Sequence, residues 1–146
     1  MPLLEALDVM RHRATGWKNY YFSMAASFIL LWVVIYPGLL LVKGVTAKEA
    51  AIIPFMALVL GFPMLLVACT VTYPVFKFLY PKTGGPHIAR TTLSGGATIA
   101  FFFAASTAMF YLTGGYESLV YAGRYVYPMA AATSVLACLI YWYVTR

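Results

Sequence analysis

Charged side chains are scarce in this sequence. It has ten Lys and Arg and four Asp and Glu among 146 residues, or 10% of the chain. A soluble domain carries roughly 25% charged residues, which keep its surface solvated. The shortage therefore excludes an ordinary water-exposed surface. Because the cations lie mostly between apolar stretches, the net charge of +6 indicates membrane topology and anionic lipid headgroups, not nucleic acid.

Acidic residues are absent from the middle of the apolar stretches. The only four are Glu5, Asp8, Glu49 and Glu117. Proton relays and cation-coupled transporters depend on an acid inside the membrane, so the sequence disfavours proton-coupled export. It also lacks paired carboxylates, an HExxH motif, a Ser-His-Asp set and a nucleotide-binding glycine motif. We therefore predict a protein that is not an enzyme and that has no cofactor.

Cysteine and histidine are equally rare, with two residues of each. Cys69 and Cys138 fall inside apolar runs and have no CxxC spacing, so we interpret them as small buried residues. A disulfide or a metal pair is the alternative. His12 and His87 fall outside the apolar runs, on the same predicted side of the membrane. We interpret them as interfacial, with haem or metal ligation as the alternative.

Long apolar runs are what the sequence has in abundance. A bilayer core about 30 Å thick needs roughly 20 such residues per helix. The pattern predicts an all-α fold, a single transmembrane domain over residues 1–146 that forms an integral membrane four-helix bundle. The expected spans are residues 20–42, 50–76, 92–112 and 120–143. Residues 2–13 have one apolar face and one charged face, which predicts a short amphipathic helix at the N-terminus that lies in the interface.

Several local signals predict where these helices begin, bend and end. Thr46 and Glu49 form a capping-box pattern that starts the second helix, and Pro63 should kink that helix. The sequence Gly84-Gly85-Pro86 separates the second helix from the third. Gly114-Gly115 should end the third helix.

The distribution of Lys and Arg predicts the orientation. Seven cations fall on one side of the predicted topology, at the two termini and between the second and third helices. Only Lys43, Lys48 and Arg124 fall on the other side. Since cytoplasmic loops are enriched in Lys and Arg, we expect both termini in the cytoplasm. No targeting peptide precedes the first run, which favours the plasma (inner) membrane of a prokaryote.

The loop around Gly84-Gly85-Pro86 has the composition of an anion-binding site. Free backbone N–H groups at a helix start favour anions, and two glycines here precede a helix that begins with proline. Cations flank it on the same predicted side. We expect contact with an anionic lipid headgroup or phosphate, against the alternative of an ordinary positive-inside loop. The expected contact residues are Lys77, Lys82, Gly84, Gly85, His87 and Arg90.

Small residues recur at four-residue spacing on the last two predicted helices. Such stripes let membrane helices approach each other closely. We expect them to pack these two helices together, and docking of a partner or of a second copy is the alternative. The residues are Ala97, Ala100, Ala104 and Ala108 on one helix and Ala130, Ser134 and Cys138 on the other.

The absence of chemistry and the short loops together favour a small non-catalytic membrane subunit or accessory protein of a larger complex. Its partners would be membrane lipids and either other membrane subunits or further copies of itself. Two alternatives stay open. One is a small carrier or flippase for a lipid-linked substrate, and the other is a homo-oligomeric channel.

Overall fold

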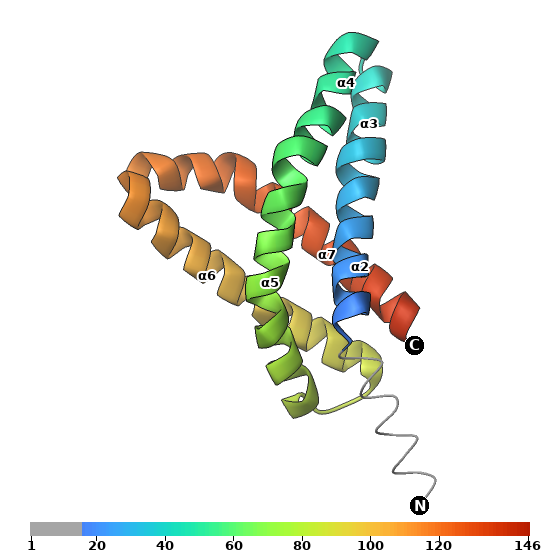
Figure 1. Cartoon of the computed structure of the whole chain (residues 1–146), viewed down its shortest axis with the longest axis vertical. Coiled ribbons are helices and arrows are strands. Elements are labelled where there is room, and N and C mark those ends of the chain that lie inside the picture. Colours follow the sequence, from blue (N-terminus) through green and yellow to red (C-terminus); the bar gives the residue numbers. More distant parts are fainter. Residues whose placement is uncertain (1–15) are drawn as a thin grey trace, which may run out of the picture.

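The computed structural model describes residues 16–146, which form three long helical runs joined by two short turns (Figure 1). The predicted interfacial helix over residues 2–13 lies outside the described residues, as does His12. The first run comprises α2 (Trp17–Ile29), the π turn η1 (Leu30–Ile35) and α3 (Tyr36–Val42). The second comprises α4 (Ala47–Met56), the π turn η2 (Ala57–Gly61), α5 (Phe62–Leu79) and the 3₁₀ turn η3 (Tyr80–Lys82). The third comprises α6 (His87–Tyr121), the π turn η4 (Ala122–Val126) and α7 (Tyr127–Thr145).

Each of the three runs is long and apolar enough to cross a membrane. The all-α character predicted from the sequence is therefore confirmed, and the three long apolar helices indicate a multi-pass membrane protein. The structure gives three long apolar helices, of which the third covers residues 87–145 and includes two of the four expected spans. It does not show a bundle of four helices.

The turn between α3 and α4 is closed by the predicted capping box. The backbone N–H of Glu49 donates to the Thr46 hydroxyl at 3.4 Å, and the Glu49 carboxylate accepts from the Thr46 N–H at 3.3 Å. These bonds satisfy N–H groups that have no partner within the helix, so α4 begins at the position that the sequence indicates.

All three π turns lie directly before an aromatic residue followed by proline. The pairs are Tyr36-Pro37, Phe62-Pro63 and Tyr127-Pro128. Proline has no N–H to donate, and its ring clashes with the carbonyl four residues earlier. A π turn closes over five residues instead of four, which gives the backbone room for that ring. The predicted distortion at Pro63 thus takes the form of the wide turn η2.

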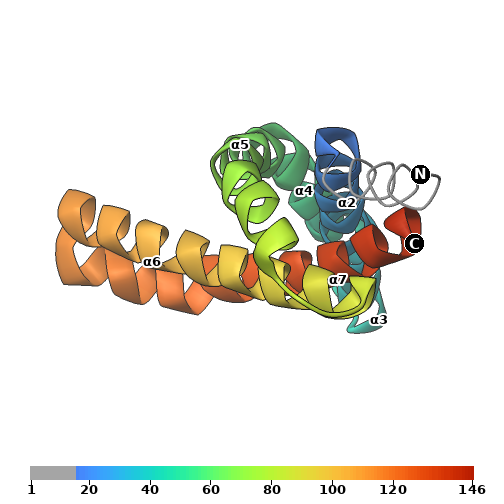
Figure 2. The ribbon, with the colours of Figure 1, turned by 90° about the horizontal axis from the view of Figure 1, so that it is seen from below.

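The third run changes direction at Gly115, which has φ 65° and ψ −155°. Only glycine readily adopts this conformation, because it has no Cβ. The break lies at the predicted end of the third helix. Beyond it the chain turns back and α7 returns past α6, so the two form an arm that extends away from α4 and α5 (Figures 1 and 2). The Thr107 and Tyr127 hydroxyls, 2.6 Å apart, join the two sides of this arm.

The core lies at one end of the molecule, where all three runs meet. Its largest members are aromatic, and the Phe76 ring lies 5.3 Å from the Tyr20 ring and 5.2 Å from the Tyr141 ring. The indole N–H of Trp32 donates to the Thr133 hydroxyl at 3.0 Å. The antiparallel packing of α2 and α7 places the start of α2 beside the end of α7 (Figure 1).

Candidate functional site

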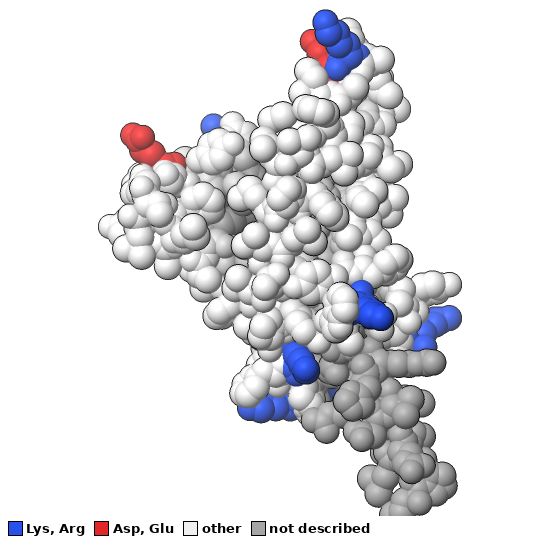
Figure 3. Space-filling model, in the orientation of Figure 1, with Lys and Arg blue, Asp and Glu red and all other residues white. Residues whose placement is uncertain are grey.

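Five cations gather at the end of the molecule that holds the core. We call this the basic end, and its residues are Lys18, Lys77, Lys82, Arg90 and Arg146. They come together because the start of α2, the turn between α5 and α6, and the end of α7 surround one core. On the face drawn in Figure 3, charged side chains occupy the extremities and a wide uncharged belt lies between them. This arrangement fits a chain that crosses a bilayer.

The remaining described charges lie at the other extremities. Lys43, Lys48 and Glu49 are in or beside the turn between α3 and α4, while Glu117 and Arg124 are near the tip of the arm. All five are exposed. Of the seven cations that the sequence count assigns to one side, the five among the described residues lie at the basic end, and the three assigned to the other side lie elsewhere. Which side of a membrane the basic end faces stays a prediction.

At the basic end, His87 at the start of α6 connects η3 to the end of α7. Its Nδ1 lies 2.6 Å from the Tyr80 hydroxyl of η3, and its Nε2 lies 2.8 Å from the Thr145 hydroxyl of α7. The Thr145 hydroxyl donates its proton to the Tyr141 carbonyl at 2.6 Å, so it accepts from His87. Nε2 therefore carries a proton. In the neutral ring, Nδ1 accepts from the Tyr80 hydroxyl, so both ring nitrogens are satisfied.

The surroundings of His87 also favour the neutral ring. His87 is the first residue of α6 and precedes the segment 92–112 that is expected to cross the membrane. Partial burial lowers the pKa of its imidazole, and the nearby positive charge of Arg90 lowers that pKa further. Both ring nitrogens are already bonded to protein hydroxyls. The residue therefore acts here as a connection between helices, and its ring has no free nitrogen to offer a headgroup.

The glycine loop, which we define as residues 83–86 between η3 and α6, lies beside two of the expected anion contacts, Arg90 and Lys82. The Arg90 Nε–H donates to the Gly85 carbonyl at 2.9 Å, and Gly85 has φ 101°, a conformation that favours glycine. The Lys82 ammonium lies 3.4 Å from the centre of the Phe78 ring. Lys77, Lys82, Gly84 and Gly85 are exposed. The structure thus brings the expected residues to one end, with His87 turned to the protein; anion binding there stays a prediction.

The expected packing residues of α6 lie on a face that α7 does not cover. Ala97, Ala100, Ala104 and Ala108 are all exposed, whereas Ala130, Ser134 and Cys138 of α7 are half-buried. The buried residues of α6 are instead Thr91, Ser94, Gly95 and Thr98. A Cβ placed on Gly95 would lie only 2.7 Å from the Cys138 sulfur. Close approach of the two helices therefore depends on Gly95 and Cys138.

Hydroxyl groups make contacts between helices that the sequence did not indicate. The Tyr20 and Thr72 hydroxyls are 2.8 Å apart and buried, and the Tyr21 and Thr70 hydroxyls are 3.0 Å apart. These pairs hold α2 against α5. The only signal in the sequence is the presence of hydroxyl residues within apolar runs, and that pattern does not say which helix they face.

Neither cysteine forms a disulfide, since Cys69 and Cys138 are both free. Within residues 16–146, no three His, Cys, Asp or Glu side chains are grouped so that they could hold a metal ion. Comparison with family models, with curated proteins and with solved structures finds no match to this chain. What the protein does must therefore be inferred from its own charges and contacts.

Proposed function

We propose that this protein is a small non-catalytic integral membrane subunit that docks onto a larger membrane complex through α6. The observation that carries the proposal is the exposed row of alanines on that helix. We call this row the alanine stripe, and it consists of Ala97, Ala100, Ala104 and Ala108.

The alanine stripe has the properties of a docking face for another helix. Small side chains at three- and four-residue spacing let two helix backbones approach closely, and in a membrane such packing drives association. The stripe continues along the part of α6 that belongs to the arm. Figure 2 shows this arm extending beyond α4 and α5, so those helices leave its outer part uncovered. A partner helix of the complex would lie against it.

The proposed subunit crosses the membrane four times, as a four-helix bundle with both termini in the cytoplasm of a prokaryote. The break at Gly115 supports two separate crossings by α6 and α7, because a single helix of residues 87–145 would far exceed the bilayer thickness. The charged residues Glu117 and Arg124 near the tip of the arm also support this, since they favour an interface over the membrane interior.

Anionic lipids are the second class of partner in this proposal. Lys77 and Lys82 are exposed beside the glycine loop, and Arg90 is held against it through Gly85. A phosphate near this loop would gain from their positive charge and from the N–H groups at the start of α6. A lipid-linked substrate carrier would use the same contact, while a channel would need several copies of the chain around one pore.

The proposal is tested by extracting the tagged protein gently from its own membrane and weighing its complexes by native mass spectrometry. We expect it to emerge bound to other membrane proteins. The substitution Ala104→Leu should release those partners, because the larger side chain keeps a helix from approaching the alanine stripe. The matched control is Ala105→Leu, which adds the same volume at a neighbouring exposed position outside the stripe.

Three outcomes contradict the proposal. A chain that emerges alone with bound lipid favours the carrier. A defined homo-oligomer that conducts ions in planar bilayers favours the channel. Equal partner loss from both substitutions would show that the stripe itself is not the docking face.

A further inference from the structure

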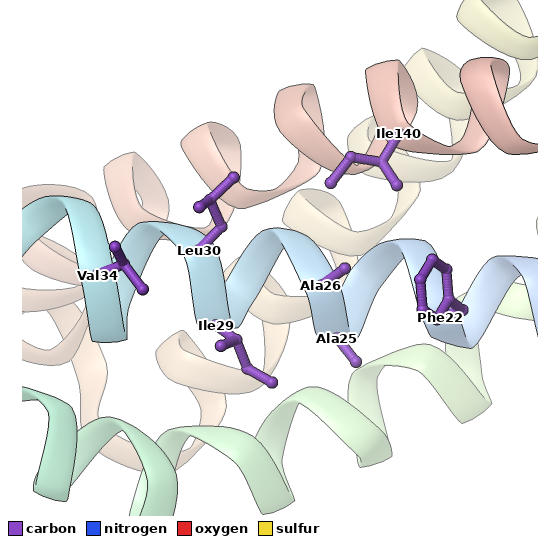
Figure 4. A pocket seen from close by; sticks show the side chains of 7 residues that line it. All are labelled: Phe22, Ala25, Ala26, Ile29, Leu30, Val34 and Ile140. Atoms are coloured by element: carbon purple, nitrogen blue, oxygen red, sulfur yellow. The ribbon is translucent and has the colours of Figure 1, made fainter.

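An apolar groove runs along α2 and η1 on the surface of the molecule. It has a volume of about 550 Å³ and is lined by Phe22, Ala25, Ala26, Ile29, Leu30, Val34 and Ile140. Phe22 and Val34 lie at its two ends, and Leu30 and Ile140 project into the space between α2 and α7 (Figure 4). Ala25 and Ala26 lie between the larger side chains and leave the middle of the groove open.

The length of the groove matches one leaflet of a bilayer. Phe22 and Val34 are twelve residues apart, which corresponds to about 18 Å along a helix at 1.5 Å per residue. One leaflet contributes about 15 Å, half of the hydrocarbon thickness of about 30 Å. A single acyl chain fits the groove over its whole length.

Positive charge lies where the headgroup of such a lipid would be. Lys18 precedes Phe22 by one helical turn, so it lies on the same face of α2 as the groove. Arg146 follows α7 at the same end of the molecule, because α2 and α7 are antiparallel. The Lys18 ammonium is 5.8 Å from the Trp17 ring, and the Arg146 guanidinium is 5.5 Å from the Trp142 ring. Aromatic and basic residues together are typical of the headgroup region.

We propose that this groove binds one acyl chain of an anionic phospholipid, whose phosphate is held by Lys18 and Arg146. The site lies on α2, η1 and α7, and it is separate from the glycine loop between η3 and α6. It is also independent of the alanine stripe, so it stands or fails apart from the proposed subunit function.

The test uses the full chain reconstituted in vesicles that contain a phosphatidylglycerol with a photoactivatable diazirine on its acyl chain. Irradiation and peptide mass spectrometry then map the labelled residues. We expect labelling concentrated in residues 22–34 and at Ile140, and several-fold weaker with a phosphatidylcholine of the same chains. Lys18→Gln should reduce this labelling about fivefold, the effect of one basic residue near an anionic headgroup. Lys48→Gln at the other end should leave it unchanged.

A second pair of variants tests the shape of the groove. Ala26→Leu should fill it and reduce the labelling, while Ala51→Leu on the exposed face of α4 should not. Lys18→Gln keeps the test decisive even if Ala26→Leu does not fold. Equal labelling by the two lipids would overturn the proposal, as would labelling spread evenly over all exposed apolar residues. A crosslink from the groove to a second copy of the chain, or to another protein, would overturn it too.

Discussion

At the scale of single residues, His87 connects three helical elements of the basic end. Its two hydrogen bonds join η3 to the end of α7 through the start of α6, and the neutral ring satisfies both of its nitrogens there. Protonation would put a proton on Nδ1 as well. The Tyr80 hydroxyl, 4% of whose residue surface is exposed, would then have to turn its proton elsewhere within a buried site. The charge state of the ring thus decides which way the hydrogen bond between Nδ1 and Tyr80 runs.

The sign of the resulting pH dependence follows from the lowered pKa of His87. An unfolded chain has a histidine pKa near its ordinary value of about 6.5. On acidification through that value, the unfolded chain takes up a proton that the folded chain does not, so folding stability falls as pH falls. We expect the melting temperature in detergent to decrease from pH 7 to pH 5. His87→Gln, which stays neutral, should lose much of this decrease.

The other histidine of the sequence provides the matched control. His12→Gln should leave the acid-induced decrease in place if His87 causes it. An unchanged decrease in His87→Gln would assign the effect to other groups.

Tyr80→Phe removes the donor to Nδ1 and should lower the free energy of unfolding by about 1 kcal/mol at neutral pH, the usual net value of one hydrogen bond.

At the scale of helical elements, local signals were predictable and side-chain partners were not. The capping box at Thr46 and the break at Gly115 depend on a few adjacent residues, so the sequence alone indicated both. The role of Gly95 depends on Cys138, which is 43 positions away along the chain. The alanine stripe was a plausible partner for α7 by spacing, yet the neighbouring row from Thr91 to Thr98 is the one that is buried.

The contact between Gly95 and Cys138 can be tested by a double-mutant cycle. Gly95→Ala should lower the free energy of unfolding by about 1–3 kcal/mol, because the new methyl group would lie 2.7 Å from the Cys138 sulfur. Cys138→Ala removes that sulfur and should restore most of the loss in the double variant. The measurement is thermal unfolding of the four proteins.

The adjacent glycine serves as the control for this cycle. Gly96→Ala meets no atom within 4 Å and should be neutral, or stabilising by up to about 1 kcal/mol, since alanine favours helix. Equal destabilisation by Gly95→Ala and Gly96→Ala would refute the close-approach interpretation.

At the scale of the whole molecule, the apolar surroundings of a membrane explain why the sequence did not show which helix faces pack together. Residues that face lipid and residues that face another helix are both apolar, so hydropathy locates spans without showing which faces meet. The core around Phe76 unites residues from all three runs, and no local pattern indicates that meeting. The same ambiguity applies to function, because exposed apolar surface is normal in a bilayer and becomes informative only at features such as the alanine stripe.

The proposed four crossings predict which positions share a side of the membrane. Single cysteines are introduced as Ala47→Cys, Gly84→Cys or Glu117→Cys, in a chain whose Cys69 and Cys138 are replaced by alanine. All three positions are exposed. With an impermeant maleimide added to intact cells, we expect positions 47 and 117 to react and position 84 to react only after lysis. Labelling of 117 together with 84 would show that α6 and α7 do not cross separately.

The packing of α2 against α7 has a consequence for how the chain is made. These are the first and the last helices among the described residues, and Trp32 of η1, which continues α2, donates to Thr133 of α7. During synthesis α2 enters the membrane long before the ribosome reaches α7. Until then the Tyr20 and Phe76 rings lack Tyr141, and lipid or an insertion factor has to cover them. A nascent chain that stops before residue 127 would therefore display an unfinished core, because Tyr141 of α7 completes it.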